Sequence, residues 1–339
     1  MDPVGQIILR LSGLCSEAKR DLRVSTNVLR LASPVFTKML STSFREGQRL
    51  ISEELPVIEL GDDEPDVMEL ILRVLHFQGN STDHEMTSER LAQVALHCDK
   101  YDLTRSLGPW VITWFRNVSG ISSDATAFGF QVLAAYMFGD RREFRDISRA
   151  AVLQLNLMFP VKWKEEALLS ILPISVTNSI KKRIQRVLNE LEAVLQCMER
   201  IIRDDSRCYN TWKLLCTECG RNLPGEAKRC HPCQNTQLLA VYCTGQTRVA
   251  QYFDVLRAVE LWPTVGYFAA SSVSQISLRF TSARESVKHA CEGGSYCPLL
   301  RTLSLISERA KEAQDWVNGL CLQCVREGED KEDGICSHR

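Results

Sequence analysis

The sequence lacks the features that place a protein in a membrane or outside the cell. Its longest apolar run, near residues 132–138, is far short of the roughly 20 residues that a membrane helix requires. No basic segment, apolar stretch and small-residue cleavage site open the chain, so we expect no secretory signal. The formal net charge of -1 leaves no overall basic excess for nucleic acid or anionic lipid. We therefore expect a cytoplasmic or nuclear protein without membrane contact, and we do not expect nucleic acid as its main partner.

The motifs of the common enzyme classes are also missing. There is no Gly-x-Ser-x-Gly, no phosphate loop ending in Gly-Lys-Ser/Thr, no dinucleotide fingerprint and no His-Glu-x-x-His. The zinc-deaminase pairing of His-x-Glu with Pro-Cys-x-x-Cys is absent too. The sequence therefore predicts a protein that is not an enzyme.

Length and composition indicate several folded domains. A chain of 339 residues is too long for one ordinary core. Hydrophobic residues at 45% and charged residues at 24% are close to the average of globular proteins. The fourteen cysteines, in a chain without a secretory signal, are expected in a reducing compartment as thiols or metal ligands rather than disulfides.

The first third of the chain alternates strand and helix signals. Apolar, β-branched or alternating segments predict three short strands, over residues 6–11, 19–25 and 56–60. The first two are close enough to form a hairpin. Ser25-Thr26-Asn27 supplies N-cap chemistry for a helix, and Pro34 and Pro65 can each begin another. The predicted order is two strands, a helix pair, a strand and a second helix pair.

This order resembles the BTB (POZ) domain, and the resemblance covers residues 6–107. The segments that carry it are Val28-Leu29, Ala32-Ser33-Pro34-Val35-Phe36, Phe44-Arg45-Glu46, Ile58-Glu59-Leu60, Leu72-Arg73-Val74-Leu75-His76 and Asp99-Lys100-Tyr101. The chain departs from the family in two places, with Gln6 where Asp is usual and Val24-Ser25 where a Val-His pair is usual. The resemblance implies an α+β fold, a small sheet with helical hairpins, that binds other proteins.

Phe44-Arg45-Glu46 is the candidate protein-binding site. In BTB proteins that act as adaptors for cullin ubiquitin ligases, a hydrophobic-x-Glu triplet at this place contacts the cullin. The resemblance therefore implies that Phe44 and Glu46 bind a cullin, and an apolar anchor beside a charge suits an interface hot spot. The alternative is that Phe44 closes the domain core and Glu46 is solvated surface.

Residues 109–205 are predicted to form an all-α extension. Apolar residues recur there at helical spacing, beginning at Pro109. Trp110, Trp114 and Trp163 are expected in the core. Residues 184–202 carry apolar side chains at alternating steps of four and three, the pattern of a coiled coil. Two interpretations stay open, a helix packed on its own chain and self-association through this seam.

Residues 206–245 contain two Cys-x-x-Cys turns separated by ten residues. Each turn aims two thiolates at one point, and four thiolates complete a tetrahedral shell for Zn²⁺. The pattern predicts a structural Cys₄ zinc knuckle formed by Cys216, Cys219, Cys230 and Cys233. Cys208, His231 and Cys243 lie nearby and are not assigned as ligands.

Residues 246–339 are predicted to form a helical, Cys/His-rich module. A Cys-x-x-Cys and a Cys-x-His separated by an acidic loop indicate a second zinc shell, formed by Cys321, Cys324, Cys336 and His338. His289, Cys291 and Cys297 either form part of another site or supply a substitute for His338. Metal binding would provide folding energy for this charged tail.

Both ends of the chain resemble a group of filamentous-fungal BTB proteins with a cysteine-rich C-terminal region. The shared segments are Leu29 to Phe36, Leu72 to Gln78, Gly319 to Arg326 and Cys336 to Arg339. This resemblance implies a BTB fold and no established biochemical role. We expect an interaction scaffold or adaptor, in its specific form a substrate adaptor for a cullin ubiquitin ligase. The alternative is a nuclear transcription-associated protein whose zinc modules contact nucleic acid.

Overall fold

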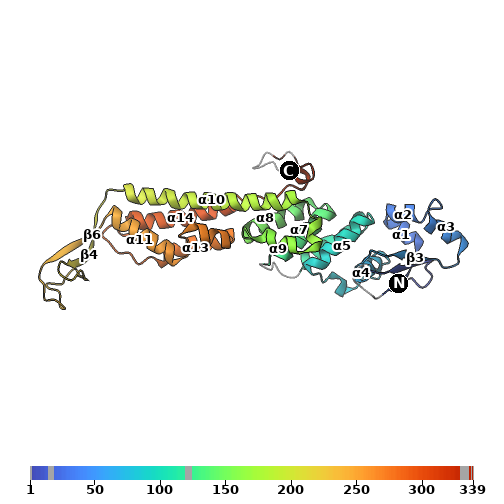
Figure 1. Cartoon of the computed structure of the whole chain (residues 1–339), viewed down its shortest axis with the longest axis horizontal. Coiled ribbons are helices and arrows are strands. Elements are labelled where there is room, and N and C mark those ends of the chain that lie inside the picture. The colour runs from blue at the N-terminus through green and yellow to red at the C-terminus, as the bar shows by residue number, and fades with distance from the viewer. Residues whose placement is uncertain (1, 14–18, 119–123, 329–335, 337, 339) are drawn as a thin grey trace. The chain divides into compact units, whose positions relative to one another are not determined.

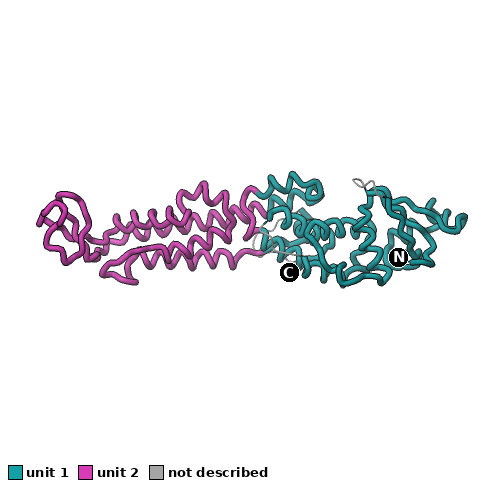
Figure 2. Tube along the Cα trace, turned by 90° about the horizontal axis from the view of Figure 1, so that it is seen from below, with its two compact units in different colours: residues 1–151, 159–179, 319–339 teal, residues 152–158, 180–318 magenta. Residues whose placement is uncertain are grey.

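The computed structural model describes residues 2–13, 19–118, 124–328, 336 and 338. The chain divides into two compact units, shown in teal and magenta in Figure 2. Unit 1 comprises residues 1–151, 159–179 and 319–339, and unit 2 comprises residues 152–158 and 180–318. The described chain is mostly helical with two small sheets, and its C-terminal half contains Cys/His clusters. The expected mixture of a small α+β sheet, helices and cysteine-rich C-terminal segments is confirmed at this level.

The first sheet lies in unit 1 and has the strand order β2-β1-β3. It is formed by β1 (Ile7–Leu11), β2 (Arg20–Val24) and β3 (Val57–Leu60). Strand β1 pairs antiparallel with β2 and parallel with β3. Ile7, Leu9 and Leu11 are fully buried, as the alternating pattern of a strand with one face on the core requires. All three strands lie where the sequence predicts them.

Helices cover this sheet and continue the unit (Figure 1). They are α1 (Thr26–Ala32), α2 (Pro34–Met39), α3 (Arg45–Ser52), α4 (Pro65–Leu75), α5 (Ser88–Lys100), α6 (Thr104–Asn117), α7 (Ala125–Phe138), α8 (Arg141–Gln154) and α9 (Phe159–Glu165). Helix α1 begins after Ser25, but the Ser25 side chain makes no capping bond. Instead, Gln6 Oε1 accepts from the Thr26 N–H at 3.0 Å. The residue that departs from the BTB pattern thus supplies the cap.

Helix α6 corrects the sequence prediction, because it begins at Thr104 and carries Pro109 inside it. Proline in a helix interior removes one backbone hydrogen bond and is unfavourable. Leu107 and Trp114, on either side of the proline, are fully buried, and this packing outweighs the lost bond. The hydrophobic core of the sheet region extends through both residues as far as Phe138. The predicted boundary between residues 107 and 109 therefore falls within one helix, and the division into four domains stays a prediction.

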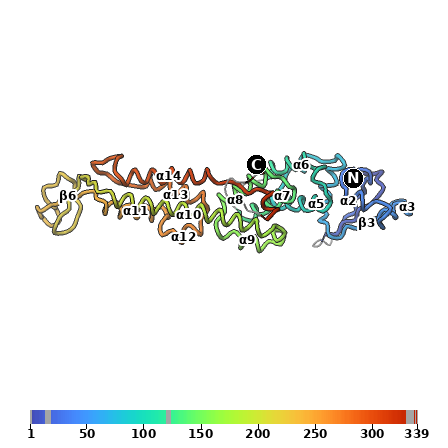
Figure 3. The backbone as a smooth tube through the Cα atoms, turned by 90° about the horizontal axis from the view of Figure 1, so that it is seen from above, coloured from blue at the N-terminus to red at the C-terminus, as the bar shows by residue number. Residues whose placement is uncertain are grey.

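Unit 2 is built on α10 (Ile174–Asp204), which enters it at residue 180. Beside it run α11 (Gly245–Ala258), α12 (Thr264–Ala270), α13 (Val273–Ser286) and α14 (Pro298–Asp315), as Figures 1 and 3 show. The coiled-coil seam of α10 is buried at every position, namely Ile184, Leu188, Leu191, Leu195, Met198 and Ile202. This is the burial expected of a helix packed on its own chain. Self-association through residues 184–202 stays a prediction.

The second sheet belongs to unit 2, and the sequence did not predict it. It consists of β4 (Tyr209–Cys216), β5 (Asn222–Pro224) and β6 (Leu238–Cys243), in the order β5-β4-β6 with antiparallel pairing. We call this sheet with its loops the ribbon. Trp212, Leu239 and Tyr242 on its strands are at least half exposed, so these large apolar side chains of the ribbon are not packed into a core.

The last described segment returns to unit 1. The Leu320 N–H donates to Ser148 Oγ at 2.7 Å, and Arg326 Nη2 donates to the Tyr136 carbonyl at 2.7 Å. The short helix α15 (Leu322–Arg326) lies in this segment. Residues 319–339 thus cluster with unit 1, whereas residues 246–318 of the same predicted module belong to unit 2. Among the residues described, no helix is long and apolar enough to cross a membrane.

Candidate metal centres

Within the part of the chain that the structure describes, three groups of four Cys or His residues place their ligand atoms within 4.8 Å of one another. A tetrahedral zinc shell with Zn–S bonds of about 2.3 Å separates its sulfur atoms by about 3.8 Å. A disulfide would require about 2.05 Å. The distances within the three groups therefore decide between these chemistries.

The ribbon cluster consists of Cys216, Cys219, Cys230 and Cys233, the four residues predicted from the Cys-x-x-Cys spacing. The Sγ atoms of Cys216 and Cys233 lie 3.5 Å apart, as do those of Cys219 and Cys230. These separations fit a shared metal ion and exclude disulfides.

Two backbone turns hold the ribbon cluster. After β4 ends at Cys216, the Gly220 N–H donates to the Cys216 carbonyl at 2.9 Å. Gly220 has a φ of +67°, in the left-handed region that glycine adopts without a steric penalty. The second turn closes with the Cys230 N–H donating to the Asn235 carbonyl at 2.8 Å. The backbone N–H of Cys219 donates to Cys216 and lowers the pKa of that thiol to about 6, which favours the thiolate that binds metal.

The tail cluster consists of Cys321, Cys324, Cys336 and His338, again the set predicted from the sequence. The Sγ atoms of Cys324 and Cys336 lie 3.3 Å apart, and His338 Nδ1 lies 3.6 Å from each of them. A hydrogen bond from the His338 backbone N–H lowers the pKa of Cys336 to about 6, whereas burial raises that of Cys324 to about 12. The acidic loop between the two halves falls largely at residues 329–335, outside those described.

The junction cluster consists of Cys243, His289, Cys291 and Cys297. His289, Cys291 and Cys297 thus form part of a separate site, one of the two alternatives left by the sequence, and none of them replaces His338. The fourth member, Cys243, was not predicted as a ligand. It ends β6 and lies 46 positions before His289. The sequence marks Cys243 as one of many cysteines and nothing more, because no local spacing connects it to the other three residues of the junction cluster.

The predicted protein-binding residues lie on the surface of unit 1. Phe44 is 50% exposed and occupies the N-cap position of α3. Glu46 follows in the first helical turn, where a carboxylate interacts favourably with the helix dipole. Half of Phe44 is thus available to a partner, so packing in the domain core alone does not explain a phenylalanine at this position.

Each cluster offers four ligands, which fill a tetrahedral shell and leave no open position for a substrate. The arrangement suits a metal ion that holds the fold together rather than one that performs catalysis. Compared with known proteins, the chain matches no family model and no curated protein.

Proposed function

We propose that the protein is an interaction scaffold with a BTB-type docking module over residues 6–107 and a C-terminal half folded around structural zinc. The strand order β2-β1-β3, with an antiparallel hairpin and a parallel third strand between helix pairs, supports the BTB resemblance. We propose zinc in the ribbon and tail clusters because their distances and thiol-rich ligand sets fit that ion.

The observation that carries the docking proposal is an apolar pair on α3. Phe44 is 50% exposed and Ile51 is 75% exposed. They are seven residues apart, two helical turns, and so share one face of the helix. Glu46 lies in the first turn of the same helix. This exposed apolar pair is suited to bind a partner with an apolar pocket, and Glu46, two positions from Phe44 and therefore on another side of the helix, is placed to meet a basic group at the rim of that interface.

In its specific form, the partner is a cullin and the protein brings a client to the ligase. The test is co-purification of cullin with the full-length protein carrying Phe44→Ala and Glu46→Ala. We expect the bound cullin to fall by about tenfold or more, as for loss of an interface hot spot. Val161→Ala is the matched control, because Val161 is also about half exposed (51%) but lies on α9.

All variants should unfold at the same temperature as the wild type, which shows that the fold is kept. Unchanged cullin capture by the double variant, or no cullin bound to the wild type, would contradict the adaptor proposal.

A further inference from the structure

The junction cluster is more deeply buried than the ribbon cluster. Cys243, Cys291 and Cys297 are each at most 3% exposed. The Sγ atoms of Cys243 and Cys297 lie 3.8 Å apart, the spacing of two sulfurs on one tetrahedral zinc ion and far beyond a disulfide bond. His289 Nε2 lies 3.2 Å from Cys291 Sγ, 3.3 Å from Cys297 Sγ and 3.6 Å from Cys243 Sγ.

The imidazole of His289 is oriented for ligation. Its Nδ1 lies 2.7 Å from Gln251 Oε1, an amide oxygen that only accepts hydrogen bonds. Nδ1 therefore carries the hydrogen, and Nε2 presents its lone pair to the three sulfurs. Metal-binding histidines are commonly held in this way by an acceptor on the other ring nitrogen.

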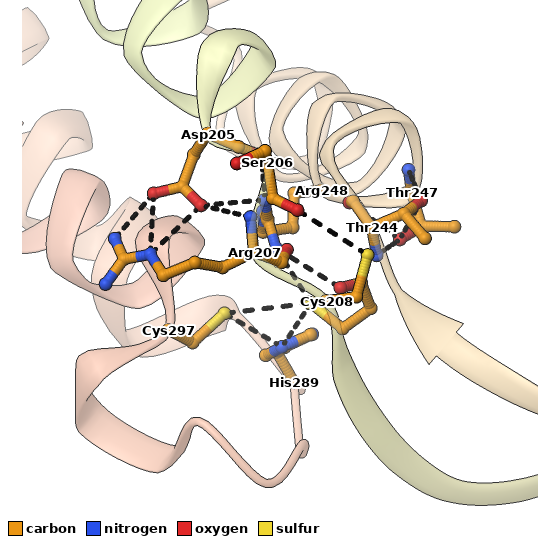
Figure 4. Close-up of polar contacts among 10 residues, drawn as sticks. Asp205, Ser206, Arg207, Cys208, Thr244, Thr247, Arg248, His289 and Cys297 are labelled. Carbon is orange, nitrogen blue, oxygen red and sulfur yellow. Dashed lines mark hydrogen bonds and ion pairs between the residues drawn. The ribbon is translucent and has the colours of Figure 1, made fainter.

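A buried cation lies directly beside the cluster (Figure 4). Arg248 is fully buried, and its Nη1 lies 3.8 Å from Cys243 Sγ. The guanidinium donates to the carbonyls of Arg207 at 2.8 Å and Asp205 at 2.7 Å. The Asp205 carboxylate is 3.4 Å away but is shared with the Arg207 side chain. A buried charge is costly unless an opposite charge compensates it.

We propose that the junction cluster binds a third zinc ion and that Arg248 neutralises the charge of the resulting complex. One Zn²⁺ with three thiolates and a neutral imidazole carries a net charge of about -1. The Arg248 guanidinium supplies the matching positive charge inside the protein. The charge of each group thereby offsets part of the desolvation penalty of the other.

This site joins three segments of unit 2. Cys243 lies where β6 meets α11, and His289, Cys291 and Cys297 lie on the connection between α13 and α14. Arg248 connects the end of α10 to this site, because it donates hydrogen bonds to the carbonyls of residues 205 and 207. The ribbon cluster, in contrast, connects only residues 216–233. The junction zinc therefore attaches the base of the ribbon to the helices of unit 2. This inference does not depend on cullin binding.

Native mass spectrometry of the full-length protein tests the proposal by counting zinc ions. We expect three per chain in the wild type and two in Cys243→Ser. Cys208→Ser is the matched control, because Cys208 is exposed, precedes the same sheet and belongs to none of the clusters. It should retain three. The same zinc count in Cys243→Ser as in the wild type would overturn the proposal. If Cys243→Ser yields no soluble protein, His289→Ala provides the second variant with the same expectation.

Arg248→Met and Arg248→Lys test the charge compensation by competition with a chelator. Loss of a group surrounding the ligands typically weakens metal binding by about 10- to 100-fold. We expect Arg248→Met to release one zinc ion at a correspondingly lower chelator concentration, and Arg248→Lys, which keeps the charge, to release it closer to the wild-type value. Equal zinc retention by Arg248→Met and the wild type would refute the role of Arg248.

Discussion

Asp63 is a fully buried carboxylate that connects the turn after β3 to the end of α5. It accepts hydrogen bonds from Lys100 Nζ at 2.7 Å and from the Tyr101 hydroxyl, and His97 Nε2 lies 3.6 Å away. Because Lys100 and Tyr101 compensate its buried charge, Asp63 stabilises the packing of α5 on the sheet region. The same segment, Asp99-Lys100-Tyr101, is part of the BTB resemblance, so the network gives that sequence pattern a structural reason.

Asp63→Ala should lower the free energy of unfolding by about 2–4 kcal/mol, because it leaves the buried Tyr101 hydroxyl without its acceptor and removes the ion pair with Lys100. Asp62→Ala is the control, since Asp62 is exposed in the same turn. Its effect should stay within about 0.5 kcal/mol. Urea denaturation of both variants measures the difference, and equal stabilities would contradict the role assigned to Asp63.

Helix α6 shows how packing overrides a local signal. Pro109 is exposed, so its side chain contributes little packing, while its missing N–H leaves a backbone carbonyl of the preceding turn without a helical partner. Replacing it with alanine restores the hydrogen bond, at the cost of a more flexible unfolded chain.

Pro109→Ala should therefore raise the free energy of unfolding by about 1 kcal/mol. Arg105→Ala, at an exposed position one turn earlier, should change it little because both residues favour helix. Thermal and urea unfolding provide the measurement. A destabilised Pro109→Ala variant would show that the proline is required where it stands.

The ribbon is an element whose order should depend on metal. Its strands expose Trp212, Leu239 and Tyr242, so hydrophobic burial provides little of its stability. The first sheet, in contrast, buries Ile7 and Leu9 completely and contains none of the cluster residues.

Chelation should accelerate amide hydrogen exchange across β4 and β6 while leaving β1 and β3 protected, because the ribbon is the one of these two sheets that carries metal ligands. Hydrogen exchange followed by mass spectrometry, with and without chelator, compares the two sheets in one sample. Unchanged protection of the ribbon after zinc removal would contradict the prediction.

At the scale of the whole chain, the features predicted from sequence are those encoded locally. Strand β1 is apolar and partly β-branched within five residues, and the ribbon and tail clusters are built from pairs of ligands two or three positions apart. Cys243 cannot be assigned as a metal ligand from the sequence, because its three partners lie 46 or more positions away. The ribbon strands cannot be predicted from the sequence, because a strand exposed on both faces has no alternating pattern of apolar and polar residues. Pro109 predicts the wrong start for α6, because the burial of Leu107 and Trp114 that keeps the proline inside the helix is a tertiary effect.

The measurement that tests the account most directly is the zinc content of the purified full-length protein, with thiol titration before and after chelation. We predict three zinc ions per chain, with the exposed Cys197 and Cys208 reacting before chelation and the cluster cysteines only afterwards. Two ions, with the same number in Cys243→Ser, would preserve the ribbon and tail sites and remove the junction site. A folded protein without zinc, whose cluster thiols all react at once, would contradict the claim that metal organises the C-terminal half.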